Sequence, residues 1–400
     1  MNKKIKEKLL KEVELAFPRA VEIRHELHRW PETGNEEFET ADIIEKELTD
    51  LGIAVKRLLN TGIIGVLEGK GDINNTKTSS QTVTALRADI DALPVNEQKG
   101  LPYSSERQGY MHACGHDVHT AVLLGTARVL CNLKDEINRG VKFIFQPAEE
   151  TTGGAERMIE AGCLKEPEVG CIYGLHVRPE LDSGKIGVKF GRVHASSDIF
   201  RITVKGKSSH GANPESGVDA LLIACQIVTN IQSIISRSVS PLDSAVITVG
   251  SIHSGNAVNI IADRAVLEGT VRTINPATRE NLRRHIKDIA ELTAMASGAF
   301  AAVDFIKGYD ALINHEEETE TVKNVGADML GSINVSVIDK PSMGAEDFSY
   351  YLQKCRGSFF FLGSGYPGRF NPPIHSDCFE VNEDCIRTGI LMLSSLVLRA

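Results

Sequence analysis

Apolar and polar positions follow helical and strand-like spacings in turn along the first half of the chain. Apolar residues recur at helical spacing from residue 3 to residue 30, and Pro31 ends this pattern because it lacks a backbone N–H. A second helix is predicted over residues 38–51. Short apolar runs at 63–67, 83–86, 141–145 and 171–175 predict strands, with helices at 120–130 and 154–161 between them. This alternation is typical of α/β folds.

The pattern changes after residue 187. Residues 198–204, 245–252, 265–271 and 301–309 predict strands, and residues 218–237 and 276–297 predict helices. The resulting order β-α-β-β-α-β is that of a ferredoxin-like unit. We therefore expect an α+β domain at 188–309, inserted into an α/β domain with a mixed sheet that is formed by 1–187 and 310–400. A final strand at 359–362 and a helix at 385–398 belong to the larger domain, and the polar stretch 72–81 is expected to form a hairpin loop.

Composition narrows the class of protein. The 400 residues are 42% hydrophobic and 24% charged, and we find no uninterrupted apolar run near the roughly 18 residues of a membrane span. The net charge of −9 disfavours nucleic acid as a partner, because binding phosphates requires a basic surface. The basic amphipathic start lacks a secretory signal pattern, so a cytosolic location is expected. The eight cysteines show no framework spacing and are expected to be mostly free thiols.

The segment 111–119, MHACGHDVH, holds three histidines, a cysteine and an aspartate just before a helix. Cys114 and His116 are two positions apart, so in a loop both side chains can turn toward one point, and thiolate with imidazole suits zinc or a similar ion. No second Cys/His pair with the spacing of a structural zinc site occurs, so further ligands must come from distant segments and include carboxylates. The alternative is a helix start capped by Asp117, with incidental histidines.

Two adjacent carboxylates, Glu149 and Glu150, follow the predicted strand 141–145. Neighbouring side chains at a strand end point to different sides, so one can bind a metal ion while the other faces a reacting water. Hydrolysis assisted by a metal ion requires this division, because one glutamate must accept the proton of the water and pass it to the leaving amine. The alternative is a solvated helix start.

Two further histidines, His176 and His375, are candidate ligands, although each alone is more often a structural residue. Their assignment as ligands is supported by the presence of Cys114, His116 and Glu150, which complete a possible ligand set.

Asp89 and Asp91 follow another strand and, by alternation, share one face. We expect Asp91 or Asp117 to accept a hydrogen bond from a ligating imidazole and so to support catalysis. Asp89 could equally cap the turn before Pro94.

The inserted domain carries three more candidates near the ends of its strands. His210 and Asn259 could donate hydrogen bonds to a developing oxyanion, and Arg272 could hold a carboxylate through two parallel bonds. Taken alone, these would be surface residues.

Together these segments resemble the M20 metallopeptidase family, in its aminoacylase/amidohydrolase branch. The matching runs are 24–28 (RHELH), 31–32 (PE), 86–94 (LRADIDALP), 112–117 (HACGHD), 146–150 (QPAEE), 174–176 (GLH), 346–348 (EDF) and His375. The resemblance implies a zinc-exopeptidase-like catalytic domain and a lid domain that also mediates formation of a homodimer or homotetramer.

The resemblance also implies roles for individual residues. Two divalent ions, which could be zinc, manganese, nickel or cobalt, would be held by five ligands, and Glu149 would be the general base. His210 would stabilise the oxyanion, with Asn259 and Arg272 near the substrate carboxylate. The five ligands are Cys114, His116, Glu150, His176 and His375.

The chain departs from other branches at Asp89, where they carry a histidine, and Cys114 supplies a ligand instead. Because the lid differs from the family pattern at further positions, the resemblance does not specify which acyl group the enzyme accepts. The expected activity is hydrolysis of N-acyl-L-amino acids, with N-acetyl or aryl-acyl groups. The alternatives are a dipeptidase and an inactive relative that binds amino-acid conjugates, although an intact Glu149 argues against the latter.

Overall fold

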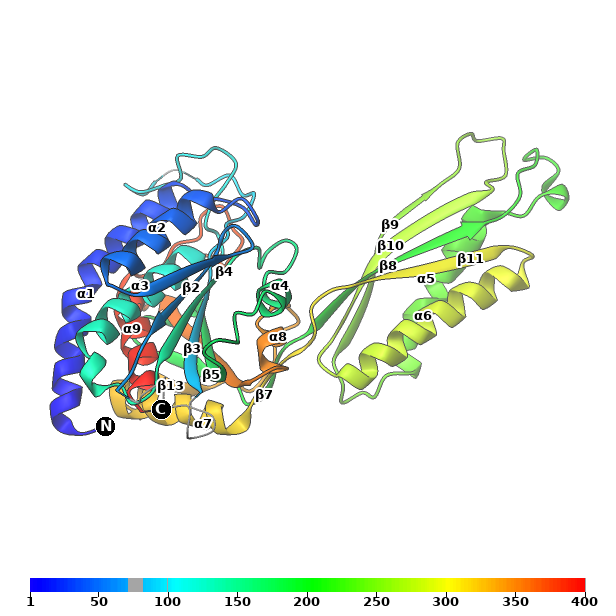
Figure 1. Cartoon of the computed structure of the whole chain (residues 1–400). Coiled ribbons are helices and arrows are strands. Elements are labelled where there is room, and N and C mark those ends of the chain that lie inside the picture. Colours follow the sequence, from blue (N-terminus) through cyan, green and yellow to red (C-terminus); the bar gives the residue numbers. More distant parts are fainter. Residues whose placement is uncertain (71–81, 99, 400) are drawn as a thin grey trace. The chain divides into compact units, whose positions relative to one another are not determined.

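The computed structural model describes residues 1–70, 82–98 and 100–399, so the hairpin expected at 72–81 lies outside the described residues. The chain divides into two compact units (Figure 1), and each has its own hydrophobic core. The first contains Met1–Gly191, Asn314–Asp339 and Tyr350–Ala400. The second contains Arg192–Ile313 and also Lys340–Ser349, a segment that the sequence pattern had assigned to the larger domain.

A mixed eight-stranded sheet forms the centre of the first unit, which confirms the predicted fold class. The strand order is β1-β2-β4-β3-β5-β14-β6-β13. The strands are β1 (Ala54–Leu58), β2 (Gly62–Leu67), β3 (Val83–Asp89), β4 (Val141–Gln146), β5 (Val169–Asp182), β6 (Ile186–Val188), β13 (Val335–Val337) and β14 (Arg356–Gly365). The accompanying helices are α1 (Lys3–Arg29), α2 (Phe38–Asp50), α3 (His116–Asn132), α4 (Ala155–Glu160), α7 (Glu316–Leu330), α8 (Ser349–Leu352) and α9 (Asp384–Val397).

Helix α3 is almost entirely buried, because it packs against α1, α9 and strand β3. Gly125 allows the close approach of α9, since a Cβ atom there would lie 2.4 Å from the Cδ1 atom of Ile390. Apolar side chains cover most of the surface of α3, including Val118, Val122 and Leu123. The position of its N-terminus is therefore fixed by packing along its whole length.

Three parallel strands bring the candidate chemistry to one edge of the sheet. Strand β3 pairs in parallel with β4 and with β5, and Asp89 lies opposite Gln146 at the carboxyl ends of the first pair. Residues that follow parallel strands meet at the same edge. Asp91, Glu149 and Glu150 therefore follow neighbouring strand ends.

The second unit has an antiparallel sheet in the order β11-β8-β10-β9, with α5 and α6 as its helices. Its elements along the chain are β8 (Ser196–Lys205), α5 (Ala220–Arg237), β9 (Ala245–Ser254), β10 (Arg264–Thr273), α6 (Pro276–Ala296) and β11 (Phe300–Lys307). At the boundary between the two units, the short strands β7 (Gly191–His194) and β12 (Leu312–Asn314) pair with each other. The order β-α-β-β-α-β is the one predicted.

Helix α5 buries a row of isoleucines at positions 223, 227, 231 and 234. Among the described residues it is also the one helix long and apolar enough to cross a membrane by length and composition. Its apolar residues are interrupted by polar ones such as Gln226 and Asn230, so the sequence shows no uninterrupted apolar run there. One such helix is weak evidence for a membrane span, and the buried isoleucines belong to the core of the unit.

Candidate metal centre and active site

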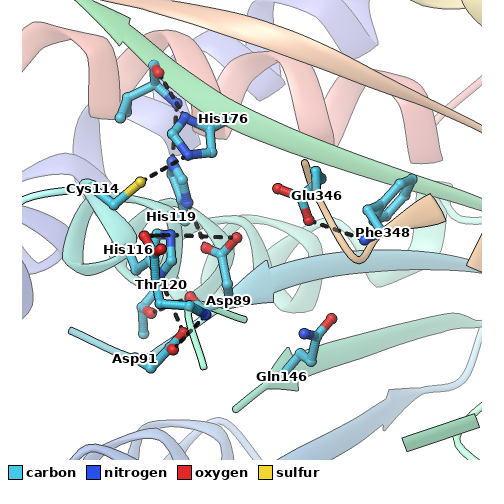
Figure 2. A network of polar contacts seen from close by, with 12 residues as sticks. Asp89, Asp91, Cys114, His116, His119, Thr120, Gln146, His176, Glu346 and Phe348 are labelled. Atoms are coloured by element: carbon cyan, nitrogen blue, oxygen red, sulfur yellow. Dashed lines mark hydrogen bonds and ion pairs between the residues drawn. The ribbon is translucent and has the colours of Figure 1, made fainter. Parts of the chain in front are cut away.

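The thiol of Cys114 lies between two imidazoles. Its Sγ atom is 3.3 Å from Nε2 of His176 and 3.2 Å from Nε2 of His375 (Figure 2 shows the first contact). The turn that directs Cys114 depends on Gly115, which has a φ of 84° and whose added Cβ would lie 2.5 Å from the Cγ2 atom of Val177. A side chain at 115 would be strained and would clash. The glycine thus allows Cys114 and His116 to converge.

The hydrogen bonds of His176 and His116 fix which ring nitrogen can bind a metal ion. Nδ1 of His176 lies 2.7 Å from the carbonyl oxygen of Val177, which can only accept, so Nδ1 carries the proton. Nδ1 of His116 lies 3.3 Å from a carboxylate oxygen of Asp91. In both rings the lone pair of Nε2 is then available as a ligand.

Glu150 completes the group. Its Oε1 atom is 3.3 Å from Nε2 of His375 and 3.8 Å from Nε2 of His116. Its backbone N–H donates to Oδ2 of Asp91 at 2.9 Å. Of the two acceptors left open by the sequence, Asp91 is therefore the one that contacts the ligand set.

These five residues fit a metal centre. Nε2 of His116 and Oε1 of Glu150 are buried without a hydrogen-bond partner, a costly state that a bound cation would relieve. Cys114, His116 and His176 form one compact group of ligand atoms, and Cys114, Glu150 and His375 form another, so the two groups share the sulfur. A donor set of sulfur, imidazole and carboxylate suits zinc and similar divalent cations.

The surrounding charge is negative. Burial, together with Glu150 and Glu149, raises the pKa of the Cys114 thiol well above its usual value. Burial alone would lower the pKa of His116, but the carboxylates of Asp89 and Asp91 raise it to about 10. Protons on these two groups compete with a cation for the same atoms, so metal binding is expected to release protons.

Glu149 is buried beside this group. One of its carboxylate oxygens, a ring nitrogen of His116 and an oxygen of Glu150 lie within 4.8 Å of one another. The adjacent glutamates therefore both reach the centre, as the strand-end position suggested.

The carboxylate of Asp89 contacts two residues that the sequence pattern did not assign to the site, Arg87 and His119. Nδ1 of His119 lies 2.5 Å from Oδ1 of Asp89, and Nε2 accepts the backbone N–H of Val177 at 2.9 Å. Arg87 donates to Oδ2 of Asp89 at 2.5 Å. Asp89 is thus held by a histidine and an arginine and does not simply cap a turn. The signal in the sequence was the spacing of His116 and His119, which places both on one helix face.

Asp117 does not orient a ligating imidazole. Its Oδ2 atom accepts from Nε of Arg24 at 3.0 Å and from Nδ1 of His28 at 2.8 Å, and all three side chains are buried. The expectation for Asp117 is therefore corrected, because the side chain turns toward α1 while His116, its neighbour, turns toward Asp91. Arg24 and His28 lower the pKa of Asp117 against the effect of its burial.

In the second unit, His210 and Asn259 lie together. His210 forms a β-bridge with Ile260, and the N–H of Gly211 donates to the carbonyl of Asn259 at 2.8 Å. Nδ1 of His210 accepts the backbone N–H of Ala212 at 3.0 Å, which leaves Nε2 free to carry a proton.

Arg272 lies at the opposite end of this sheet. Strand β10 begins at Arg264, just after the loop of Asn259, and its next-to-last residue is Arg272. Eight residues of extended strand separate the two ends by about 27 Å. One copy of this unit therefore cannot bring Asn259 and Arg272 to the same carboxylate, so the expected placement of both near the substrate requires two copies of the chain and stays a prediction.

Comparison with known proteins places this site in a family. Residues 85–399 match the model of peptidase family M20/M25/M40. An N-acetyl-L-cysteine deacetylase of Bacillus subtilis is 40% identical over 91% of this chain and 84% of its own length. An IAA-amino acid hydrolase of Arabidopsis thaliana is 37% identical over 96% of this chain and 87% of its own.

A solved structure agrees. The Bacillus subtilis YXEP protein, described as a dinuclear metal binding peptidase of the M20 family, has a TM-score of 0.83 and 32% identity over 96% of this chain and 98% of its own. The chain belongs to peptidase family M20/M25/M40 and is an enzyme of the amidohydrolase type, as the resemblance implied.

Proposed function

We propose that this enzyme hydrolyses the amide bond of N-acyl-L-amino acids, with an N-acetyl or aryl-acyl group, and releases a carboxylic acid and a free amino acid. The observation that carries the proposal is the position of Glu149 beside two ligand groups that share the sulfur of Cys114. The two relatives named above support the substrate class, since their names specify an N-acetylated and an IAA-conjugated amino acid.

Two divalent ions, which we propose to be zinc, manganese, nickel or cobalt, fit the two groups of ligand atoms. When bound, such ions would polarise the amide carbonyl and make water more acidic. Glu149 then accepts a proton from the attacking water as the new C–O bond forms. It returns this proton to the amide nitrogen as the C–N bond breaks, so the amino acid leaves as a neutral amine.

We further propose that the enzyme works as a homodimer, or as a homotetramer built from such dimers. His210 and Asn259 lie at one end of the second unit's sheet and Arg272 at the other. If His210 stabilises the oxyanion and Arg272 holds the substrate carboxylate, the two must come from different copies of the chain. The eight cysteines are free thiols, which suits the reducing cytosol that we propose as its location.

The test is a substrate panel assayed with enzyme reconstituted separately with each of the four metals. We expect turnover of N-acetyl and aryl-acyl amino acids, and its near-complete loss in Glu149→Gln with the metal content unchanged. Turnover of unblocked dipeptides alone would favour a dipeptidase. Binding of N-acyl amino acids without any hydrolysis by metal-loaded protein would favour a conjugate-binding relative.

A further inference from the structure

Glu37 is a buried acid at the start of α2, and it makes its hydrogen bonds outside that helix. Its Oε1 atom accepts the backbone N–H of Ala148 at 2.8 Å, and its Oε2 atom accepts the hydroxyl of Thr61 at 2.9 Å. The side chain makes no capping hydrogen bond to α2. Glu37 therefore does not act as the side-chain cap of α2, and its carboxylate joins two segments that lie far apart in the sequence.

The backbone that Glu37 holds is unusual. Ala148 has a φ of 57°, in the left-handed region that residues other than glycine rarely adopt. Its carbonyl accepts the N–H of Gly153 at 2.9 Å, which closes the loop that carries Glu149 and Glu150. Such a conformation persists where the surroundings fix it. The hydrogen bond from Ala148 to Glu37 is one of the contacts that do so.

Glu149 lies between two anchored peptide groups. The N–H of Ala148 donates to Glu37, and the N–H of Glu150 donates to Asp91 at 2.9 Å. Both acceptors are buried carboxylates. The first of these groups is the peptide between Pro147 and Ala148, and the second is the peptide between Glu149 and Glu150. The peptide between Ala148 and Glu149 is held by the bond from Gly153, so all three limit the directions in which the Glu149 side chain can leave the backbone.

The segment before Glu37 supports the same loop. A Cβ atom at Gly34 would lie 2.9 Å from the Cα atom of Ala148, so the two backbones are in close contact. Nδ2 of Asn35 donates to the hydroxyl of Thr152 at 3.1 Å. Residues 34–37 thus pack against the loop from Ala148 to Thr152 and form hydrogen bonds with it.

We infer that Glu37 is a positioning residue for Glu149, and this inference rests on the proposed function of Glu149 as the general base. Glu37 acts through the amide of Ala148 and takes no part in proton transfer itself. Its hydrogen bonds go to Thr61 and Ala148, and neither is a metal ligand. Loss of its carboxyl group should therefore lower kcat while KM and the metal content stay close to those of the wild type.

The test compares Glu37→Ala with Glu37→Gln and Thr61→Val, using metal-reconstituted full-length enzyme and an N-acetyl amino acid. In Glu37→Gln the side-chain oxygen can still accept from Ala148 while its amide group donates to Thr61. We expect Glu37→Ala to lower kcat by about tenfold to a hundredfold, because a small misplacement of a reacting group has effects of this size. Glu37→Gln should restore kcat to within about twofold, and Thr61→Val, which keeps the bond to Ala148, should behave like the wild type.

Three results would overturn the inference. They are an unchanged kcat in Glu37→Ala, an equal loss of kcat in Glu37→Ala and Glu37→Gln, and a loss of bound metal that accounts for the loss of activity. If Glu37→Ala fails to fold, Glu37→Asp takes its place, because its shorter side chain cannot reach both partners, and the same expectations apply. Failure of the proposed function is distinguishable, since wild-type enzyme would then hydrolyse no N-acyl amino acid, or Glu149→Gln would retain full activity.

Discussion

The carboxylate of Asp91 accepts the backbone N–H of Glu150 at 2.9 Å. Its other oxygen lies 3.3 Å from Nδ1 of His116, so one buried side chain holds a carboxylate ligand and an imidazole ligand. Because Asp91 follows β3, Glu150 follows β4 and His116 begins α3, this contact joins three elements of the first unit. The shape of the metal centre therefore depends on a residue that is not itself a proposed ligand.

We predict that Asp91→Asn weakens metal binding by about tenfold to a hundredfold, the usual cost of losing an acceptor behind a ligating histidine. An asparagine can still accept from Glu150, but its amide group then faces Nδ1 of His116 and favours the ring tautomer protonated at Nε2. Competition with a chelator measures the affinity. Unchanged binding by Asp91→Asn would show that this contact does not orient the ligand.

Asp117 contributes to the stability of the folded chain and not to the orientation of a metal ligand. We predict that Asp117→Ala lowers the free energy of unfolding by about 3 kcal/mol, because Arg24 is left buried without this partner. Urea denaturation of the metal-free protein measures the change. Metal affinity should fall less than in Asp91→Asn. A larger loss of affinity than of stability would instead place Asp117 in the metal centre.

The pH dependence of stability offers a separate test of Glu37. Burial, and then the nearby charge of Asp91, raise the pKa of Glu37 from 4.5 to about 7 in the folded protein. The folded state therefore holds this proton more tightly than the unfolded state. The resulting stabilisation is full below pH 4.5 and is lost as the pH rises through about 7.

Glu37→Gln lacks this titration. Relative to the wild type, it should gain about 3 kcal/mol of stability as the pH rises from 4.5 to 7, and nothing further above that. Denaturant titrations of both metal-free proteins across this range provide the comparison. A stability difference that does not vary with pH would contradict the raised pKa.

The loop of His375 supplies another prediction. His375 has a φ of 64° and a side chain that is 51% exposed, which makes it the most accessible of the five proposed ligands. Gln98 donates from its side chain to Oδ2 of Asp377 at 2.9 Å and from its backbone to the carbonyl of Asp377 at 2.8 Å. We predict that Gln98→Ala weakens binding of one of the two ions by about tenfold.

Isothermal titration calorimetry of the metal-free protein should then resolve one metal site with weakened affinity and one with unchanged affinity. Asn132→Ala, which removes a comparable exposed amide–carboxylate bond from Asn132 to Glu12 at 2.7 Å, is the matched control and should leave both affinities unchanged. Equal weakening of both sites by Gln98→Ala would contradict the assignment of this effect to the His375 loop.

The sequence predicted the regular elements whose apolar pattern is long. The central part of α3 is an example, although the helix begins at His116 in the structure and was predicted to begin at residue 120. Its first residues follow a left-handed Gly115 without a side-chain cap, so no local polar signal marked the start. Short strands such as β6 and β13, with three residues each, are too brief to show a period.

The candidate ligands were recognisable because several sit in dense or strand-end clusters. Of the residues that support them, Asp91 was a candidate, whereas His119 and Glu37 were not. Asp89 and His119 are 30 positions apart, and Glu37 and Ala148 are 111 positions apart. Such pairs depend on how the strands and helices are brought together, so spacing along the chain carries no signal for them. The choice between Asp91 and Asp117 was open for the same reason.

The central claim is that Cys114 binds metal as a shared thiolate within a set of five ligands. The most direct measurement is anomalous diffraction from crystals of the zinc-loaded protein. We predict two zinc peaks per chain, flanked by the five proposed ligands, with the Sγ atom of Cys114 at about 2.3 Å from zinc. Zinc bound elsewhere, or a Cys114 sulfur outside bonding distance of both peaks, would contradict it.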